Sequence, residues 1–82
     1  MVTTIQRLPT VKAATGLSRS SVYGHISQGL FPKPIQISCR AVGWLSHETD
    51  AILSARIAGK SDDEIRELVI ELTNQRATGG AI

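Results

Sequence analysis

The fold of this chain is decided by residues 15–31, which read TGLSRSSVYGHISQGLF. Ser18 is a typical N-cap residue, and the apolar side chains of Val22 and Ile26 follow at the i, i+4 spacing of one helix face. This pattern predicts a helix over residues 19–28. The glycine that follows it ends the helix, because glycine adopts the positive φ of a helix C-terminus at little cost.

A second short helix is predicted immediately before this one. Pro9 and Thr10 open it, either with Thr10 as the N-cap or with Pro9 in the first turn, where its missing N–H is no loss. Val11 and Ala14 share one face at i, i+3 spacing, and Gly16 ends the segment. Two short helices joined by a glycine-containing turn predict a helix-turn-helix.

A small hairpin is predicted after the helix-turn-helix. The two prolines of the Phe-Pro-Lys-Pro stretch at residues 31–34 forbid further helix, because each lacks the N–H donor and restricts the residue before it. Residues 35–37 and 42–44 then alternate as short strands, and residues 38–41 form the turn between them.

The rest of the chain predicts two more helices. The first begins at Ser46, a third N-cap, and continues to Gly59. The second begins with the capping box Ser61-Asp-Asp-Glu64 and carries an apolar stripe at i, i+3, i+4, i+7 spacing. The stripe consists of Ile65, Leu68, Val69 and Leu72. It either packs into the core of the domain or forms a dimer interface.

The order helix, turn, helix, hairpin, helix, helix predicts a mainly α fold with a small β-hairpin, the layout of a winged helix-turn-helix. We divide the chain into four segments. They are a flexible or edge-strand lead-in (residues 1–7), the winged helix-turn-helix domain (8–59), a C-terminal amphipathic helix (60–76) and a disordered tail (77–82).

The charges are distributed unevenly along the 82 residues, although the net charge is only +2. Residues 1–47 contain five Lys or Arg and no Asp or Glu, whereas residues 48–82 contain four Lys or Arg and seven Asp or Glu. The first part therefore carries +5 and the second −3. This asymmetry indicates a basic face that meets an anionic partner.

Several classes of protein are disfavoured by the same sequence. The longest apolar run has five residues, whereas a membrane helix needs about 20. No basic segment followed by an apolar stretch opens the chain, which argues against a secretory signal. The lone Cys39 cannot form an internal disulfide, which fits a reducing cytoplasm.

His47-Glu48 begins like a zinc-protease motif, but Ala51 occupies the position of the second ligand. We expect neither enzymatic activity nor a cofactor nor a metal.

The second helix of a helix-turn-helix enters the DNA major groove with its N-terminal residues at the base edges. Arg19 can bind guanine bidentately or bond to phosphate, and the serine hydroxyls can bond to phosphate oxygens. Tyr23 either contacts DNA or packs at the core edge under the hairpin. Gly24 costs up to about 1 kcal/mol relative to Ala in mid-helix, and either close approach to DNA or a lack of constraint explains it.

The hairpin supplies the second predicted contact surface, with a cation at its tip and another at its base. Trp44, by contrast, is predicted to be core. The complete set of predicted DNA-binding residues is Ser18, Arg19, Ser20, Ser21, Tyr23, Gly24, Ser27, Lys33, Ser38 and Arg40.

Four strings in the sequence resemble the AlpA family of phage-related regulators. They are RLPTV at residues 7–11, TGLSRSSVY at 15–23, GLFPKPI at 29–35 and AVGW at 41–44. The resemblance covers residues 5–58. It departs from the family pattern at Gly24, where a bulkier or charged residue is usual, and at residues 12–13, where Lys-Ala replaces a more apolar and acidic pair.

The resemblance implies a prophage- or mobile-element-encoded DNA-binding protein that controls transcription, similar in fold to excisionase and MerR-type winged-helix proteins. The implied recognition helix is residues 18–28 and the implied wing is residues 35–44. The expected partner is double-stranded DNA at the bacterial nucleoid. A homodimer or cooperative oligomer on DNA, and RNA polymerase or an integrase, are further candidate partners, and no membrane is expected. Two alternatives remain: an excisionase-like DNA-bending factor, and a protein-interaction module that acts through the C-terminal helix.

Overall fold

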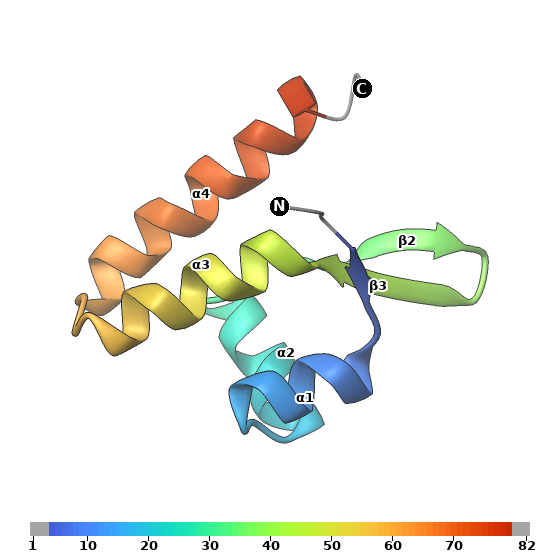
Figure 1. Ribbon diagram of the computed structural model, residues 1–82, viewed down its shortest axis with the longest axis horizontal. Coiled ribbons are helices and arrows are strands. Elements are labelled where there is room, and N and C mark those ends of the chain that lie inside the picture. The colour runs from blue at the N-terminus through green and yellow to red at the C-terminus, as the bar shows by residue number, and fades with distance from the viewer. Residues whose placement is uncertain (1–3, 80–82) are drawn as a thin grey trace.

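The helix predicted from residues 15–31 is α2 (Arg19–Ser27) in the computed structural model, which describes residues 4–79 (Figure 1). The hydroxyl oxygen of Ser18 accepts a hydrogen bond from the backbone N–H of Ser21 at 3.2 Å, as an N-cap does. Gln28 is the C-cap, and Gly29 follows with a φ of 77°. The second helix of the motif is therefore confirmed, with its end one residue earlier than predicted.

The first helix of the motif is α1 (Leu8–Thr15). Its N-cap is Arg7 and Pro9 lies in its first turn, so the alternative with Pro9 is correct and Thr10 is not the cap. Gly16 closes the helix with a φ of 72°. The predicted inward face is right for Val11, which is fully buried, but wrong for Ala14, which is exposed. The inward face instead consists of Leu8, Val11 and Thr15. These positions follow one another at intervals of one helical turn, and the side chains of Leu8 and Thr15 are partly buried.

The predicted hairpin is present and gains a third strand. β2 (Ile35–Ser38) and β3 (Ala41–Leu45) pair antiparallel, and β1 (Ile5–Gln6) pairs antiparallel with the other edge of β3, which gives the order β1-β3-β2. Residues 5 and 6 thus follow the edge-strand alternative rather than the flexible one, while residues 1–3 lie outside the described part of the chain.

Gly43 lies where the side chains of both edge strands converge. A Cβ atom added to Gly43 would lie 2.5 Å from Cγ2 of Ile5, 2.9 Å from Cδ1 of Ile37 and 3.0 Å from the carbonyl oxygen of Gln6. Real Cβ atoms do not approach other heavy atoms so closely. A side chain at this position would therefore force β1 and the end of the Ile37 side chain to shift.

The third helix, α3 (Ser46–Ile57), follows β3 without an intervening loop. Its N-cap is therefore Leu45, the last residue of the strand, and the prediction that Ser46 caps it is wrong. Ser46 anchors the start of the described chain instead. Its hydroxyl oxygen accepts a hydrogen bond from the N–H of Thr4 at 2.9 Å, and its own N–H donates to the carbonyl oxygen of Thr4 at 2.8 Å.

The fourth helix, α4 (Asp62–Gly79), begins with the predicted capping box. The N–H of Ser61 donates to Oε1 of Glu64 at 3.2 Å, and the N–H of Glu64 donates back to the Ser61 hydroxyl oxygen at 3.3 Å. These hydrogen bonds, the one from the Ser61 backbone first, hold the pKa of Glu64 below its ordinary value. Residues 77–79 continue the helix, so the tail predicted to start at residue 77 is wrong there, and residues 80–82 lie outside the described residues.

The core centres on Trp44, which is fully buried as predicted. Its indole N–H donates to the carbonyl oxygen of Pro32 at 3.0 Å, and its ring lies 6.2 Å from that of Tyr23 and 6.3 Å from that of Phe31, measured between centroids. Every element except β1 and β2 contributes to the buried set or packs directly against it. That set consists of Val11, Val22, Leu30, Phe31, Trp44, Ile52, Ile65, Val69 and Leu72.

The apolar stripe of α4 belongs to this core. Ile65, Val69 and Leu72 are buried, and Leu68 packs against them. In Figure 1, α4 lies along α3, α1 lies on the other side of α3, and the β2–β3 hairpin projects from the helices on one side. The mainly α, winged helix-turn-helix prediction is confirmed. None of the helices within residues 4–79 has the length and hydrophobicity that crossing a bilayer requires.

Candidate nucleic-acid interface

The outward face of α2 gathers part of the predicted contact set. Arg19, Ser20, Tyr23 and Ser27 are exposed, and they occupy neighbouring turns of the helix. Val22 faces the core and Ile26 packs against it from the same helix, so burial of one side fixes which side chains face solvent. The predicted arrangement of Arg19 and its neighbours on an accessible face therefore agrees with the structure.

Ser18 and Ser21 are engaged with each other. Besides the cap hydrogen bond, the Ser18 hydroxyl donates to the hydroxyl oxygen of Ser21 at 3.0 Å. The hydroxyl groups of Ser18 and Ser21 therefore stabilise the N-terminus of α2 in the free protein. Because Ser18 stays exposed, its hydroxyl still has capacity for an additional hydrogen bond from outside.

Tyr23 combines the two roles that the sequence left open. Its ring meets Trp44 edge-on, with an interplanar angle of 67°, which joins α2 to the strand β3. At the same time 38% of the residue is exposed. The core contact fixes the ring, and the exposed part remains available for contact with a partner.

Gly24 has no packing reason to be glycine. A Cβ atom added there meets nothing within 4 Å, and its φ is not positive. The protein itself therefore imposes no constraint at this position of α2. A partner that approaches the helix closely, or no constraint at all, explains the residue, as the sequence indicated.

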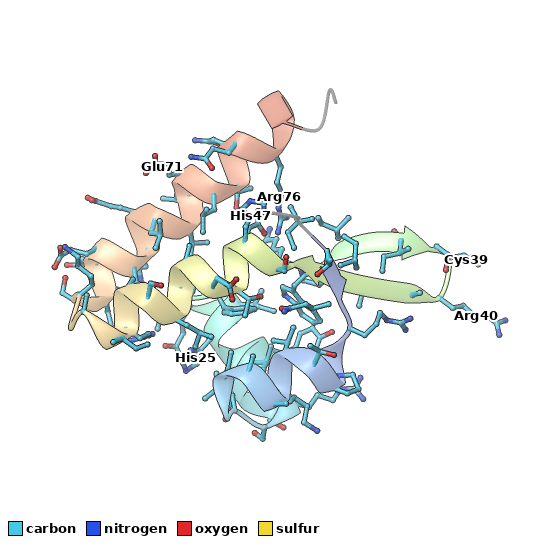
Figure 2. All side chains as sticks on the ribbon, viewed as in Figure 1. His25, Cys39, Arg40, His47, Glu71 and Arg76 are labelled. Atoms are coloured by element: carbon cyan, nitrogen blue, oxygen red, sulfur yellow. The ribbon has the colours of Figure 1, made fainter. Side chains whose placement is uncertain are left out.

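The hairpin carries its candidate residues away from α2. Ser38, Cys39 and Arg40 are exposed, and Figure 2 shows Cys39 and Arg40 at the far tip of the hairpin, directed away from the helices. Lys33 is exposed at the base of the hairpin. The predicted residues thus divide between the outer face of α2 and the projecting hairpin, whose tip lies away from the helices.

Sequence reasoning missed the group that holds the base of the hairpin. Arg76 of α4 donates from Nε to Oε2 of Glu48 at 2.8 Å and from a terminal nitrogen to Oε1 of the same carboxylate. The terminal nitrogen also donates to the carbonyl oxygen of Lys33 at 2.8 Å. Glu48 is fully buried, so this bidentate pair satisfies a carboxylate that has no access to water. No local spacing signals such a pair, because its members are 28 residues apart.

The ion pairs lie in the same half of the chain as the acidic residues, residues 48–82. The four cations of the second half, Arg56, Lys60, Arg66 and Arg76, each form an ion pair with a carboxylate. The five cations of the first half are all exposed, and none of them forms an ion pair with any residue in the described range 4–79. They are Arg7, Lys12, Arg19, Lys33 and Arg40. The cations of residues 1–47 are therefore not neutralised by any carboxylate in the part of the chain that the structure describes.

Within residues 4–79 no metal site stands out, and the pocket beside the helix-turn-helix is small. No group of three or more His, Cys, Asp or Glu side chains within residues 4–79 is placed to hold a metal ion. A pocket of about 190 Å³ lies beside the helix-turn-helix, lined by Leu17, His25, Phe31, Leu53 and Arg56 among others. It is smaller than the roughly 300–1,000 Å³ of most small-molecule sites.

Residues 4–57 match the family described as Prophage CP4-57 regulatory protein (AlpA). The protein named Uncharacterized protein ORF88 from Enterobacteria phage P4 is 41% identical over 54 residues, which cover 66% of this chain and 61% of the phage protein. The DNA-binding transcriptional activator AlpA of Escherichia coli (strain K12) is 34% identical over 58 residues, which cover 63% of this chain and 83% of that protein. No solved structure matches.

The family match contains α1, α2, the three-stranded sheet and α3, and it ends where α3 ends. It thus confirms the resemblance seen in residues 5–58, and α4 lies beyond it. Because the match covers well over half of the 82 residues, the chain belongs to the family of the prophage CP4-57 regulatory protein, AlpA.

Proposed function

We propose that this protein is a sequence-specific regulator of prophage or mobile-element type that binds double-stranded DNA. The N-terminal turns of α2 enter the major groove, and the β2–β3 hairpin contacts the flanking backbone. The observation that carries the proposal is the set of five exposed cations that have no carboxylate partner within the described residues, all in the half of the chain that holds α2 and the hairpin.

The division of labour follows from the chemistry of each residue. Arg19, at the first turn of α2, reads a guanine or bonds to phosphate, while Ser20 and Ser27 bond to phosphate oxygens. Lys33 and Arg40, at the two ends of the hairpin, neutralise phosphates on either side. The exposed part of Tyr23 meets sugar or a thymine methyl group.

The named activity of the E. coli relative, a DNA-binding transcriptional activator, supports the proposal. In the mechanism that we propose, the bound protein occupies a promoter and recruits or blocks RNA polymerase. The family to which the chain belongs is itself described as regulatory, which favours this role over a purely structural one.

The test is fluorescence anisotropy with duplexes selected by the protein from a randomised pool, measured over a range of salt concentrations. We expect the logarithm of the affinity to fall with that of the salt concentration by about 0.9 for each neutralised phosphate. If Arg19 reads a base, Arg19→Ala weakens binding by about 1–3 kcal/mol, or roughly 5- to 150-fold, and relaxes the site preference.

The matched control is Lys60→Ala, which also removes one positive charge. Lys60 lies between α3 and α4 and forms an ion pair with Glu64. We expect it to change the affinity far less than Arg19→Ala does. Equal losses for the two variants would remove α2 from the interface, and the absence of any duplex affinity at low salt would overturn the function itself.

A further inference from the structure

The segment between α2 and the hairpin is held at both of its ends by arginines of α4. At the end of α2, Nε of Arg66 donates to the carbonyl oxygen of Gln28 at 2.9 Å. The aliphatic part of Arg66 also lies over Gly29, since a Cβ atom added there would be 3.7 Å from its Cγ. At the start of the hairpin, Arg76 donates to the carbonyl oxygen of Lys33 at 2.8 Å.

The orientation of Arg76 is fixed by the buried carboxylate of Glu48. The two bonds to Glu48 use the planar fork of the guanidinium and leave a further N–H of the same group for Lys33. Figure 2 shows Arg76 directed from α4 toward the beginning of α3 and away from the hairpin tip. A lysine at position 76 can keep an ion pair with Glu48, but it lacks the planar fork that reaches both acceptors in one geometry.

The hairpin base is consequently fixed at two successive peptide groups. The carbonyl of Pro32 accepts from the Trp44 indole and the next carbonyl accepts from Arg76, two residues before β2 begins at Ile35. Phe31 and Pro32 are buried, so the segment has little room to shift. The direction in which the hairpin leaves the helices is therefore set partly by α4.

We propose that α4 is a brace that sets the position of the hairpin relative to α2, with Arg66 and Arg76 as its positioning residues. The two arginines are ten residues apart, or about 15 Å along a helix, and they hold the two ends of the linker at residues 29–34. The inference rests on the proposed DNA binding in one respect: a fixed spacing between the two contact surfaces raises affinity, although neither arginine touches DNA. The brace lies outside the segment that matches the family.

The test is a set of double-mutant cycles on duplex affinity, with Arg76→Lys as the probe of the brace. We expect Arg76→Lys to weaken binding at least about threefold, the equivalent of one lost hydrogen bond, and to lower the salt slope. In the background of Arg40→Ala, where the hairpin tip has lost its cation, the same change has a smaller effect. In the background of Arg19→Ala, Arg76→Lys keeps its full effect on affinity, because Arg19 lies on α2 and its contact does not depend on the position of the hairpin.

Two matched variants complete the experiment. Arg56→Lys makes the same substitution at an arginine that pairs with Asp62 and forms no hydrogen bond with the described linker residues, so we expect unchanged affinity. Arg66→Lys probes the other end of the brace at a partly exposed position and is expected to reproduce the loss seen for Arg76→Lys. An undiminished affinity in both brace variants, or equal losses in the Arg19→Ala and Arg40→Ala backgrounds, overturns the brace.

A measurement without DNA separates failure of the brace from failure of the proposed function. Amide hydrogen exchange of residues 33–45 in the free protein is expected to accelerate in Arg76→Lys relative to Arg56→Lys, because the hairpin base has lost an anchor. If the wild-type protein binds no duplex but the exchange rates change as expected, the function is wrong and the brace stands. If the protein binds duplex but the exchange rates do not change, the brace is wrong.

Discussion

Replacement of Ile65 by alanine tests whether the stripe of α4 is part of the core of a single chain. Ile65 is fully buried, whereas Ile70 on the same helix is 61% exposed. Truncation of a buried isoleucine to alanine costs about 2–5 kcal/mol, because the lost contacts leave a cavity. A domain of 82 residues has a total free energy of unfolding of about 4–12 kcal/mol. Ile65→Ala therefore removes a large part of the stability, and we expect its melting temperature to fall by at least about 8 °C.

Ile70→Ala is the matched control, because it makes the same chemical change in the same helix at an exposed site. We expect it to change the free energy of unfolding by no more than about 0.5 kcal/mol. Both variants gain the same intrinsic helix propensity from alanine, so the difference between them isolates burial.

The assay is urea unfolding followed by fluorescence of the single tryptophan, Trp44, which is buried in the folded protein. Unfolding midpoints are compared over a range of protein concentrations. A cost for Ile65→Ala no greater than that for Ile70→Ala would refute the core assignment. A wild-type midpoint that rises with protein concentration, and ceases to do so in Ile65→Ala, would place the stripe between two chains instead.

Three further predictions concern single positions. Gly43→Ala is expected to destabilise the fold by about 1–3 kcal/mol in urea titrations, because its Cβ collides with both edge strands; an unchanged midpoint would contradict the crowding. Gly24→Ala is expected to stabilise the free protein by about 0.5–1 kcal/mol, since its Cβ has open space, and to weaken duplex binding in anisotropy titrations if α2 approaches DNA closely. Because the pKa of Glu64 is lowered in the folded protein, its contribution to stability is complete above the ordinary pKa of 4.5 and is lost as pH falls through the folded pKa. The wild-type protein should therefore lose stability on acidification below about pH 4.5 more steeply than Glu64→Gln, and identical pH profiles would exclude this contribution.

The parts of the fold that sequence predicted are those whose cause lies within a few residues. The Ser18 cap bonds to Ser21, and Ser61 and Glu64 bond to each other, so each signal and its partner fall in one turn of helix. The glycine ends of α1 and α2 are equally local.

The parts that sequence could not predict join distant segments. β1 has two residues, too few for any periodicity, and its partners at positions 44 and 45 are known only once the hairpin has folded. The role of Ser46 also depends on a distant segment. Serine is a common N-cap residue, but the hydroxyl oxygen of Ser46 accepts a hydrogen bond from the N–H of Thr4 instead. No local pattern identifies the Arg76–Glu48 pair, because nothing in the neighbouring residues distinguishes a bidentate buried pair from an exposed one.

The candidate interface was predictable to a similar extent. The exposed face of α2 followed from burial of Val22 on the opposite side of the helix, and the exposed tip of the hairpin followed from its turn. What the sequence lacked was the placement of the hairpin tip away from α2 and the anchor at Lys33, because both depend on contacts between distant segments.

The separation of satisfied from unsatisfied cations gives the molecule an electric dipole. The elements formed by residues 4–47 carry cations that have no carboxylate partner among the described residues, whereas each cation of residues 48–79 is paired with a carboxylate and acidic groups are in excess there. In the field of a polyanion such a body experiences a torque as well as an attraction. Under the proposed function, this torque turns the basic surface toward DNA before contact and raises the rate of encounter by a factor that decreases as salt screens the field.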